Sequence, residues 1–284
     1  MEPSMLHCPA PAKLNLFLHV TGRRADGYHL LQTAFQLIDY SDTLDFAVRV
    51  DGAIRRCNDV AGVPEDSDLI VRAARLLQSY TDCKLGADLT LHKKLPMGGG
   101  LGGGSSDAAT TLMVLNHLWQ TGLSRAELQQ LGLQLGADVP FFIFGRNAFA
   151  EGVGELLQPI QTAECWFVVI EPGVQVPTPA IFSAKELTRD TKPIRIADFS
   201  SHIKMFGKND LQAVASALFP PVDAAIQWLS TYGEARMTGS GACVFCAFAD
   251  EFSADEALRQ VPDRWKSWKA KALHKHPLDY LMQT

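Results

Sequence analysis

The part of the chain with the clearest chemical signature is a glycine-rich segment that ends near Ala109. Six of the seven residues from Gly98 to Gly104 are glycines. Such a run costs much backbone entropy, so it is expected where the backbone needs positive φ angles or must approach a ligand closely. A predicted helix begins at Ser105 or Ser106, so free N–H groups and the positive end of the helix dipole would meet at this loop. The segment therefore predicts a phosphate-binding site.

Two common phosphate-binding motifs do not fit this loop. Gly98, Gly100 and Gly103 form a G-x-G-x-x-G pattern, but a dinucleotide-binding fold also needs an acidic residue about 20 positions later, after a second strand. The candidate, Glu127, is instead the third helical residue of a capping box that opens at Ser124. A Walker A loop needs a lysine after the glycines, and this chain has none there.

When the other candidate residues are considered singly, each also has an ordinary structural interpretation. Lys13 and Asn15 share one face of a predicted strand and can line one pocket, although a strand lysine is more often solvated. Asp138 follows a predicted helix end and precedes Pro140, which is typical of a turn or capping residue. Tyr28 would by default be a core aromatic. The Gly239–Gly241 segment is either a turn between two strands or a second contact to phosphate.

The elements that must position these residues alternate between strands and helices, which predicts an α+β fold with a soft boundary near 155–175. Strict alternation of apolar residues predicts a strand over 12–20, followed by a turn that ends in Asp26-Gly27. Further strands are predicted over 30–39, 43–50, 88–95, 166–171, 235–239, 242–249 and 266–273. Further helices are predicted over 69–80, from 105 or 106 to about 119, from 125 to near 136, and over 208–218, 221–232 and 253–260.

The composition excludes several classes of protein. With 26 Lys+Arg against 31 Asp+Glu, the 284 residues carry a formal charge of −5, and the chain has no basic cluster typical of a nucleic-acid surface. No apolar stretch is long enough to span a membrane, and no export signal is evident, so we expect a cytoplasmic protein. The six cysteines are widely spaced and are expected to be reduced. Cys243 and Cys246 form a C-x-x-C pattern, but they fall in a predicted strand where their side chains point to opposite faces.

The glycine-rich segment resembles the ATP-binding loop of the GHMP small-molecule kinases. Pro11-Ala-Lys-Leu-Asn-Leu16 and Met237-Thr-Gly-Ser-Gly-Ala-Cys243 also resemble segments of that superfamily. Three further motifs are similar to the branch that phosphorylates the 2-hydroxyl of a cytidine diphosphate-linked methylerythritol in the non-mevalonate isoprenoid pathway. They are Gly22-Arg-Arg-Ala-Asp-Gly-Tyr-His-Leu30, Gly136-Ala-Asp-Val-Pro140 and Ala150-Glu-Gly-Val-Gly154.

This resemblance implies a fold of two lobes, 1–160 and 161–284, with the active site in the cleft between them. It implies that Asp138 accepts the proton of the substrate hydroxyl and that Lys13 supplies the neighbouring positive charge. The implied ATP-binding residues are Pro96, Met97, Gly98, Gly99, Gly100, Leu101, Gly102, Gly103, Gly104, Ser105 and Ser106. The implied substrate-binding residues are Asn15, Tyr28, His29, Thr178 and Phe182, with Tyr28 and Phe182 on either side of the cytosine base.

Three points stay open at the level of sequence. Mg²⁺ is expected because phosphoryl transfer from ATP needs its charge neutralised, and Ser106 is the best candidate ligand. Phe182 could instead be a core residue, and Asp107 is interpreted as a helix cap. The alternatives to this substrate are another GHMP kinase, a non-catalytic nucleotide sensor that lacks the Lys13–Asp138 pair, and, least favoured, a dehydrogenase.

Overall fold

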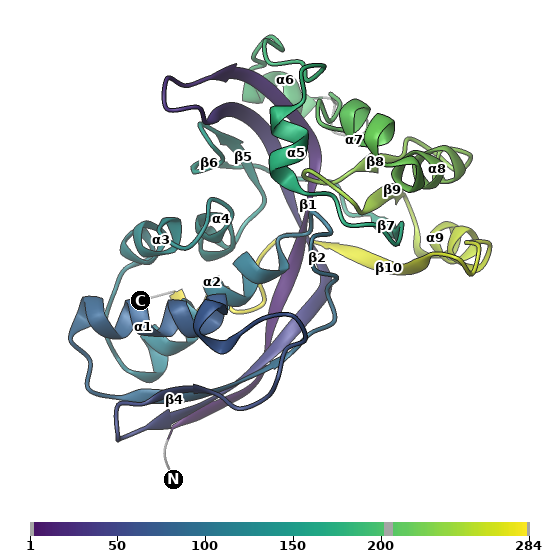
Figure 1. Cartoon of the computed structure of the whole chain (residues 1–284). Helices are drawn as coiled ribbons and strands as arrows, with labels where there is room; N and C mark the ends of the chain where they lie inside the picture. Colours follow the sequence, from purple (N-terminus) through teal and green to yellow (C-terminus); the bar gives the residue numbers. More distant parts are fainter. Residues whose placement is uncertain (1–2, 202–206, 283–284) are drawn as a thin grey trace.

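Two very long antiparallel strands form a central ribbon in the molecule. The computed structural model describes residues 3–201 and 207–282, and in it β1 (Ser4–Arg23) pairs with β2 (His29–Arg49) along almost its whole length. Figure 1 shows this ribbon running through both halves of the molecule. Side chains from one strand therefore reach both halves.

The other strands are arranged around this ribbon in one mixed sheet. The order is β3-β4-β2-β10-β7-β9-β8, while β1 and β5 also pair with β2, and β6 pairs with β5. The bounds of these strands are β3 (Ile54–Arg56), β4 (Gly86–His92), β5 (Ala148–Glu151), β6 (Leu156–Pro159), β7 (Trp166–Glu171), β8 (Arg236–Met237), β9 (Val244–Phe248) and β10 (Lys266–Leu273).

The helices form two groups. The first group is α1 (Leu69–Thr81), α2 (Gly103–Leu118), α3 (Arg125–Leu133) and α4 (Val139–Phe144). The second group is α5 (Thr178–Ser183), α6 (Ile196–Ser201), α7 (Gln212–Leu218), α8 (Pro220–Leu229) and α9 (Glu251–Arg259). In Figure 1, α1 to α4 lie beside the lower half of the ribbon, and α5 to α9 lie beside its upper half. Two short 3₁₀ turns are η1 (Glu65–Ser67) and η2 (Asp279–Met282).

Each half has its own hydrophobic core. The lower core packs α1, α2 and α4 against β2 and β4, and it also contains Leu278 and Leu281 from the end of the chain. The upper core packs α7, α8 and α9 against β7 and β9, and it also contains Leu18 and Val20 of β1. Both cores thus draw on sequence from the two ends of the chain. The division into lobes at residue 160 stays a prediction.

The α+β prediction is confirmed, but the two strands predicted over 30–39 and 43–50 are a single strand, β2. The polar residues 39–42 interrupt the apolar alternation, which is why the sequence suggested a break. The pairing of β2 with β1 shifts in register between Pro11 and Ala12, opposite these polar residues, and the two strands remain paired on either side of the shift. Asp42 is completely buried there and accepts hydrogen bonds from the backbone N–H groups of Lys94 and Leu95. A tertiary contact therefore keeps the strand continuous.

Several short elements were missing from the prediction, namely α4, α5, α6, β3, β5 and β6. Of these, α4 matters most because Asp138 is its N-cap residue and Pro140 lies in its first turn. An aspartate followed closely by proline is a start signal for a helix, so this element was open to prediction. The strands predicted over 166–171 and 266–273 have the predicted bounds, as β7 and β10.

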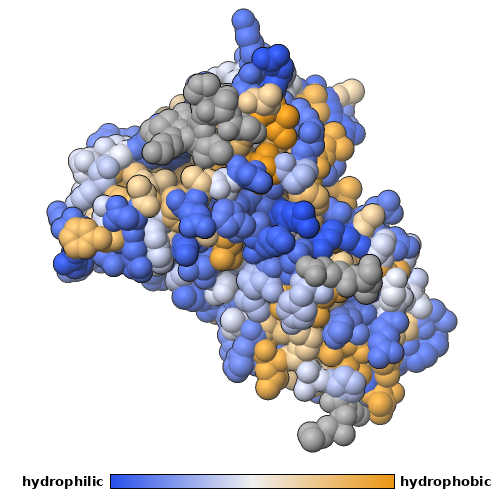
Figure 2. All heavy atoms as spheres, turned by 180° about the vertical axis from the view of Figure 1, so that it is seen from behind, coloured by the Kyte–Doolittle hydropathy of each residue, from blue (hydrophilic) through white to orange (hydrophobic). Residues whose placement is uncertain are grey.

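The surface is mixed in character. Seen from behind, it is largely hydrophilic, with smaller hydrophobic groups scattered over both halves (Figure 2). Among the described residues, no helix combines the length and apolar character needed to cross a bilayer. The cytoplasmic location expected from the sequence stays a prediction.

Candidate active site

A cavity of about 820 Å³ is lined by residues that are far apart in the sequence. It brings together the predicted residues Lys13, Asn15, Tyr28, His29, Gly98, Gly100, Gly102, Ser105, Asp138, Thr178 and Phe182. A second cavity, of about 370 Å³, shares the glycine loop with the first, and every predicted loop residue from Pro96 to Ser105 lines it. Ser106 lines neither cavity because its side chain is fully buried.

The glycine loop has the backbone geometry that its composition predicts. Gly98, Gly100 and Gly102 have φ angles of 71°, 74° and 73°, a region that residues with a Cβ rarely occupy. Gly102 is the N-cap of α2, which therefore begins at Gly103, two residues earlier than the first predicted start. The first-turn N–H groups of this 16-residue helix lie next to both cavities. The loop can therefore receive an anionic group.

The Gly239–Gly241 segment is a turn between β8 and β9, and it packs directly on the glycine loop. The backbone N–H groups of Ala242 and Cys243 donate to the carbonyl oxygens of Gly98 and Gly99, at 3.2 and 3.1 Å. The turn interpretation is thus confirmed. Its contact with phosphate stays a prediction, although Gly239, Ser240 and Gly241 also line the larger cavity.

We expect Gly98→Ala to raise the KM for ATP by about 10- to 150-fold, because a Cβ at this position would keep phosphate from hydrogen bonds worth about 1.5–3 kcal/mol. A Cβ at Gly98 would meet no other atom within 4 Å, so it would project into open space by the loop. Gly122→Ala is the matched control, since Gly122 has a φ of 72°, open space around it and no place in either cavity. An equal change in both variants, measured by steady-state kinetics, would refute the assignment of the loop.

Lys13, Asn15 and Asp138 meet at the wall of the larger cavity. The Lys13 ammonium donates to Asn15 Oδ1 at 2.6 Å and lies 3.7 Å from Asp138 Oδ2. Lys13 and Asn15 come from adjacent positions on one face of β1, as predicted, whereas Asp138 comes from the start of α4. The structure therefore brings the predicted catalytic pair together.

The two charged groups of this pair differ in their exposure. The Lys13 side chain is only 4% exposed, so burial lowers the pKa of its ammonium, while the carboxylate of Asp138 opposes that shift. Asp138 is 35% exposed and, although it occupies an N-cap position, its side chain makes no capping hydrogen bond. The interpretation of Lys13 as a solvated strand residue is therefore wrong, and so is the interpretation of Asp138 as a residue whose side chain caps a helix. The carboxylate is left available to the cavity.

Two threonines that sequence reasoning missed hold Asn15 in place. Asn15 Nδ2 donates to Thr33 Oγ1 at 2.9 Å, and Thr33 in turn donates to the carbonyl oxygen of Phe17. The backbone N–H of Asn15 donates to Thr238 Oγ1 at 3.0 Å, and Thr238 donates to the carbonyl oxygen of Gly100. These bonds connect β1 with the glycine loop. Thr33 has no local signal, whereas Thr238 lies in the Met237–Cys243 segment, although nothing in that segment assigns it a role of its own.

At another part of the cavity, aromatic residues face one another. The rings of His29 and Phe182 have centroids 4.9 Å apart, and Tyr28 is 66% exposed. The default expectation of a buried Tyr28 is therefore wrong. Thr178 shares a 2.7 Å hydrogen bond with Ser240 of the turn. Burial lowers the pKa of His29, and the positive charges of Arg189 and Arg23 lower it further, so His29 is neutral near pH 7.

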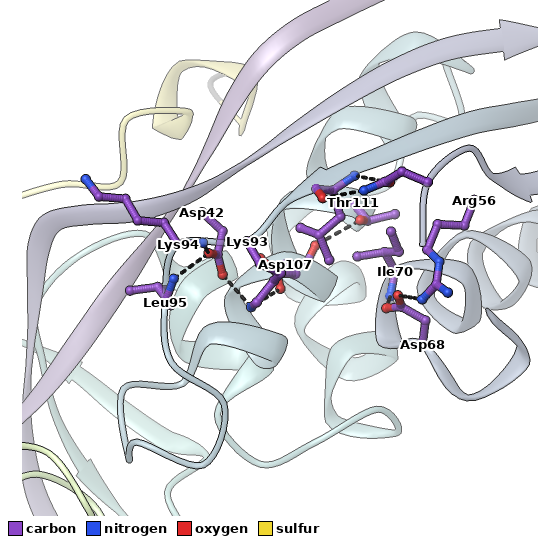
Figure 3. Close-up of polar contacts among 11 residues, drawn as sticks. Asp42, Arg56, Asp68, Ile70, Lys93, Lys94, Leu95, Asp107 and Thr111 are labelled. Carbon is purple, nitrogen blue, oxygen red and sulfur yellow. Dashed lines mark hydrogen bonds and ion pairs between the residues drawn. The ribbon is translucent and has the colours of Figure 1, made fainter. Parts of the chain in front are cut away.

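Asp107 is not the helix cap expected from the sequence. It is the fifth residue of α2 and is buried, where the Lys93 ammonium bridges it to Asp42 at 3.0 and 2.5 Å (Figure 3). Burial raises the pKa of Asp107 to about 8, although Lys93 opposes this shift and Asp42 adds to it. Lys93 and Asp107 both line the smaller cavity. The cluster of Asp42, Lys93 and Asp107 therefore lies beside the glycine loop and can stabilise it.

The C-x-x-C pattern forms no metal site. Cys243 and Cys246 are buried in different hydrophobic clusters, as the strand prediction required, and all six cysteines are free. Burial raises the pKa of Cys246 to about 11, so it is an inert thiol. Within residues 3–201 and 207–282 there is no group of three His, Cys, Asp or Glu side chains that could hold a metal.

Comparison with known proteins agrees with this site. The GHMP kinases N terminal domain matches residues 68–146, and the GHMP kinases C terminal domain matches residues 183–267. The 4-diphosphocytidyl-2-C-methyl-D-erythritol kinase of Janthinobacterium sp. (strain Marseille) is 68% identical over 289 residues, covering 100% of both chains. The chain belongs to the GHMP kinase family. It is therefore a kinase, and its family implies ATP as the phosphoryl donor.

Solved structures give the same result. A crystal structure of 4-(cytidine 5'-diphospho)-2C-methyl-D-erythritol kinase superposes with a TM-score of 0.80 at 32% identity, over 95% of this chain and 99% of that one. Homoserine kinase from Cytophaga hutchinsonii has a TM-score of 0.72 at 14% identity, over 97% and 96% of the two chains, which shows a shared fold. The resemblance found in the sequence is confirmed, and the dehydrogenase alternative is excluded.

Proposed function

We propose that this protein transfers the γ-phosphoryl group of ATP to the 2-hydroxyl of 4-diphosphocytidyl-2-C-methyl-D-erythritol, a step of the non-mevalonate isoprenoid pathway. The observation that carries the proposal is that one cavity is lined by the glycine loop, the Lys13–Asp138 pair and the aromatic residues around His29. The names of similar relatives support this choice of alcohol.

In this mechanism the protein acts mainly by alignment and charge. Asp138 accepts the proton of the attacking hydroxyl, and its carboxylate lies 3.7 Å from the Lys13 ammonium. Lys13 stabilises the negative charge that develops as the phosphoryl group passes between oxygens. The N–H groups of the glycine loop and of the first turn of α2 bind the ATP phosphates. Asn15 holds the Lys13 ammonium through their 2.6 Å hydrogen bond.

Magnesium is the expected metal, and Ser106 is the ligand that the sequence suggests. Ser106 Oγ has no hydrogen-bond partner in the described part of the chain, and oxygen donors suit Mg²⁺. The residue is fully buried and lines neither cavity, however, so its side chain does not reach the space where phosphate would bind. When bound, the ion would neutralise phosphate charge.

At the aromatic site, Tyr28 and Phe182 stack on the two faces of the cytosine, His29 hydrogen-bonds its edge and Thr178 contributes a hydroxyl group. Their place in the same cavity as the Lys13–Asp138 pair supports this assignment. The cytidine diphosphate would then extend from the aromatic residues toward the reacting hydroxyl. This arrangement makes the base a determinant of substrate choice.

A substrate panel tests the proposal. Purified protein with ATP and Mg²⁺ is assayed with the cytidine diphosphate-linked alcohol, mevalonate and homoserine, and ADP release is measured for each. We expect kcat/KM to be highest for the cytidine alcohol by several orders of magnitude. A preference for mevalonate or homoserine would identify another member of the family, and no turnover with any alcohol would favour a nucleotide sensor.

We expect Tyr28→Ala to raise the KM for the cytidine alcohol by about 5- to 150-fold, because a base–aromatic stack is worth about 1–3 kcal/mol. The KM for ATP and the melting temperature should change little, since Tyr28 is 66% exposed. Tyr80→Ala is the control, because Tyr80 is also exposed and lies on α1 outside both cavities. A similar rise in both KM values would indicate a general defect rather than lost base recognition.

A further inference from the structure

Arg189 is a half-buried residue outside the predicted site, and its guanidinium is almost fully engaged. Its Nη2 donates to the carbonyl oxygens of Phe182 and Ala184, at 3.0 and 2.7 Å, and its Nη1 donates to that of Leu187 at 3.0 Å. Its Nε donates to His29 Nε2 at 3.2 Å. One side chain thus connects the C-terminal end of α5, which carries Phe182, with the histidine of the aromatic site.

The bond to His29 determines where the imidazole carries its proton. An arginine has only donors, so His29 Nε2 must accept with its lone pair. A neutral imidazole has one N–H, which must then lie on Nδ1. Burial and two neighbouring guanidinium groups favour the neutral ring by lowering the pKa of His29. The ring therefore offers a single hydrogen-bond donor, and no partner for that donor lies within the described parts of the chain.

We propose that Arg189 is a positioning residue that fixes His29 as the Nδ1–H tautomer and holds the end of α5, which carries Phe182, beside it. The aromatic site then presents a hydrogen-bond donor to an acceptor atom of a pyrimidine, such as cytosine N3 or O2. The recognition part of this inference rests on the proposed function. The tautomer part stands on the 3.2 Å bond alone and does not depend on any substrate.

The tautomer is tested on the unliganded protein. We label the imidazole nitrogens with ¹⁵N and record long-range ¹H–¹⁵N spectra at neutral pH, with His29→Gln to identify the His29 signals. In the wild type we expect a protonated Nδ1 and an unprotonated Nε2, and in Arg189→Met we expect the proton to move largely to Nε2. A wild-type protein with its proton on Nε2 would overturn the inference even if every Arg189 variant failed to fold.

Kinetics tests the consequence for recognition. We expect Arg189→Met to raise the KM for the cytidine alcohol about tenfold, in keeping with one lost hydrogen bond and a loosened end of α5, with kcat and the KM for ATP nearly unchanged. Arg189→Lys, which keeps the charge and one donor, should restore part of the loss. Arg259→Met is the control, because Arg259 lies on α9 and lines neither cavity.

The outcomes separate the two hypotheses. An unchanged KM in Arg189→Met, or an equal rise for both substrates, would overturn the positioning role. A wild-type protein that has the Nδ1–H tautomer but prefers an alcohol without a base would refute the proposed substrate, and with it the recognition role, while the tautomer assignment would stand. Failure of the inference and failure of the proposed function therefore give different results.

Discussion

Asp138→Asn is expected to lower kcat by about 10²- to 10⁴-fold while both KM values stay close to those of the wild type. A positioned acid–base group contributes an effect of this size, and asparagine keeps the volume of the side chain but cannot accept the hydroxyl proton. Because Asp138 makes no capping hydrogen bond, the melting temperature should fall only through the lost attraction between its carboxylate and the Lys13 ammonium. Steady-state kinetics and thermal unfolding of the same preparation measure both quantities.

The matched control is an aspartate that does cap a helix. Asp250 is the N-cap of α9, its carboxylate accepts a hydrogen bond from the Ser253 N–H at 2.9 Å, and it lines neither cavity. Asp250→Asn should leave kcat unchanged and lower stability only slightly, because asparagine is also a good cap. A near wild-type kcat in Asp138→Asn would falsify the base assignment while leaving the kinase fold and its nucleotide site intact.

Lys13→Met should also lower kcat by about 10²- to 10⁴-fold, because it removes the positive charge beside the reacting oxygen at similar side-chain length. The loss in the double variant with Asp138→Asn should be smaller than the product of the two single losses, since the groups act together. Folding should tolerate the change, because the carboxylate of Asp138 that loses its partner is 35% exposed and can be hydrated. If the loss of kcat in the double variant equals the product of the two single losses, the two residues act independently.

The pH dependence of turnover gives a second test of Lys13. Burial lowers the pKa of Lys13, so its charge should be lost below the pH at which an ordinary lysine titrates, near 10.5, and kcat should fall as the pH rises through that lowered pKa. Asp138 opposes the shift, so the residual activity of Asp138→Asn should decline at still lower pH. The profile of Lys13→Met should lack this decline. An identical alkaline decline in all three proteins would assign it to another group.

Lys13 should affect the pH dependence of stability in the opposite direction to its effect on kcat. Between the lowered folded pKa and the unfolded value near 10.5, the unfolded chain binds more protons than the folded chain. The free energy of unfolding therefore rises with pH through this window for the wild type relative to Lys13→Met. Activity and this part of the stability should thus change in opposite directions in the same alkaline range.

The sequence by itself determined the backbone geometry of the glycine loop and the family. A run of glycines before a helix has few physical uses other than positive φ angles and contact with an anion, so its meaning is local. The strict alternation in β1 likewise placed Lys13 and Asn15 on one face without any knowledge of their partners. The ordered motifs around these residues were sufficient to identify a GHMP kinase.

Only the tertiary structure decided what each isolated polar residue does. Asp138 has the sequence context of a turn, and its role depends on Lys13, which lies 125 positions earlier in the chain and 3.7 Å away in space. Asp107 has the context of a helix cap, but burial beside Lys93 and Asp42 makes it part of an ion cluster. Arg189 has no local signal at all, because its proposed role depends on bonds to His29 and to the end of α5. Backbone geometry is encoded locally, whereas the charge state and orientation of a side chain depend on neighbours that the fold brings from distant parts of the chain.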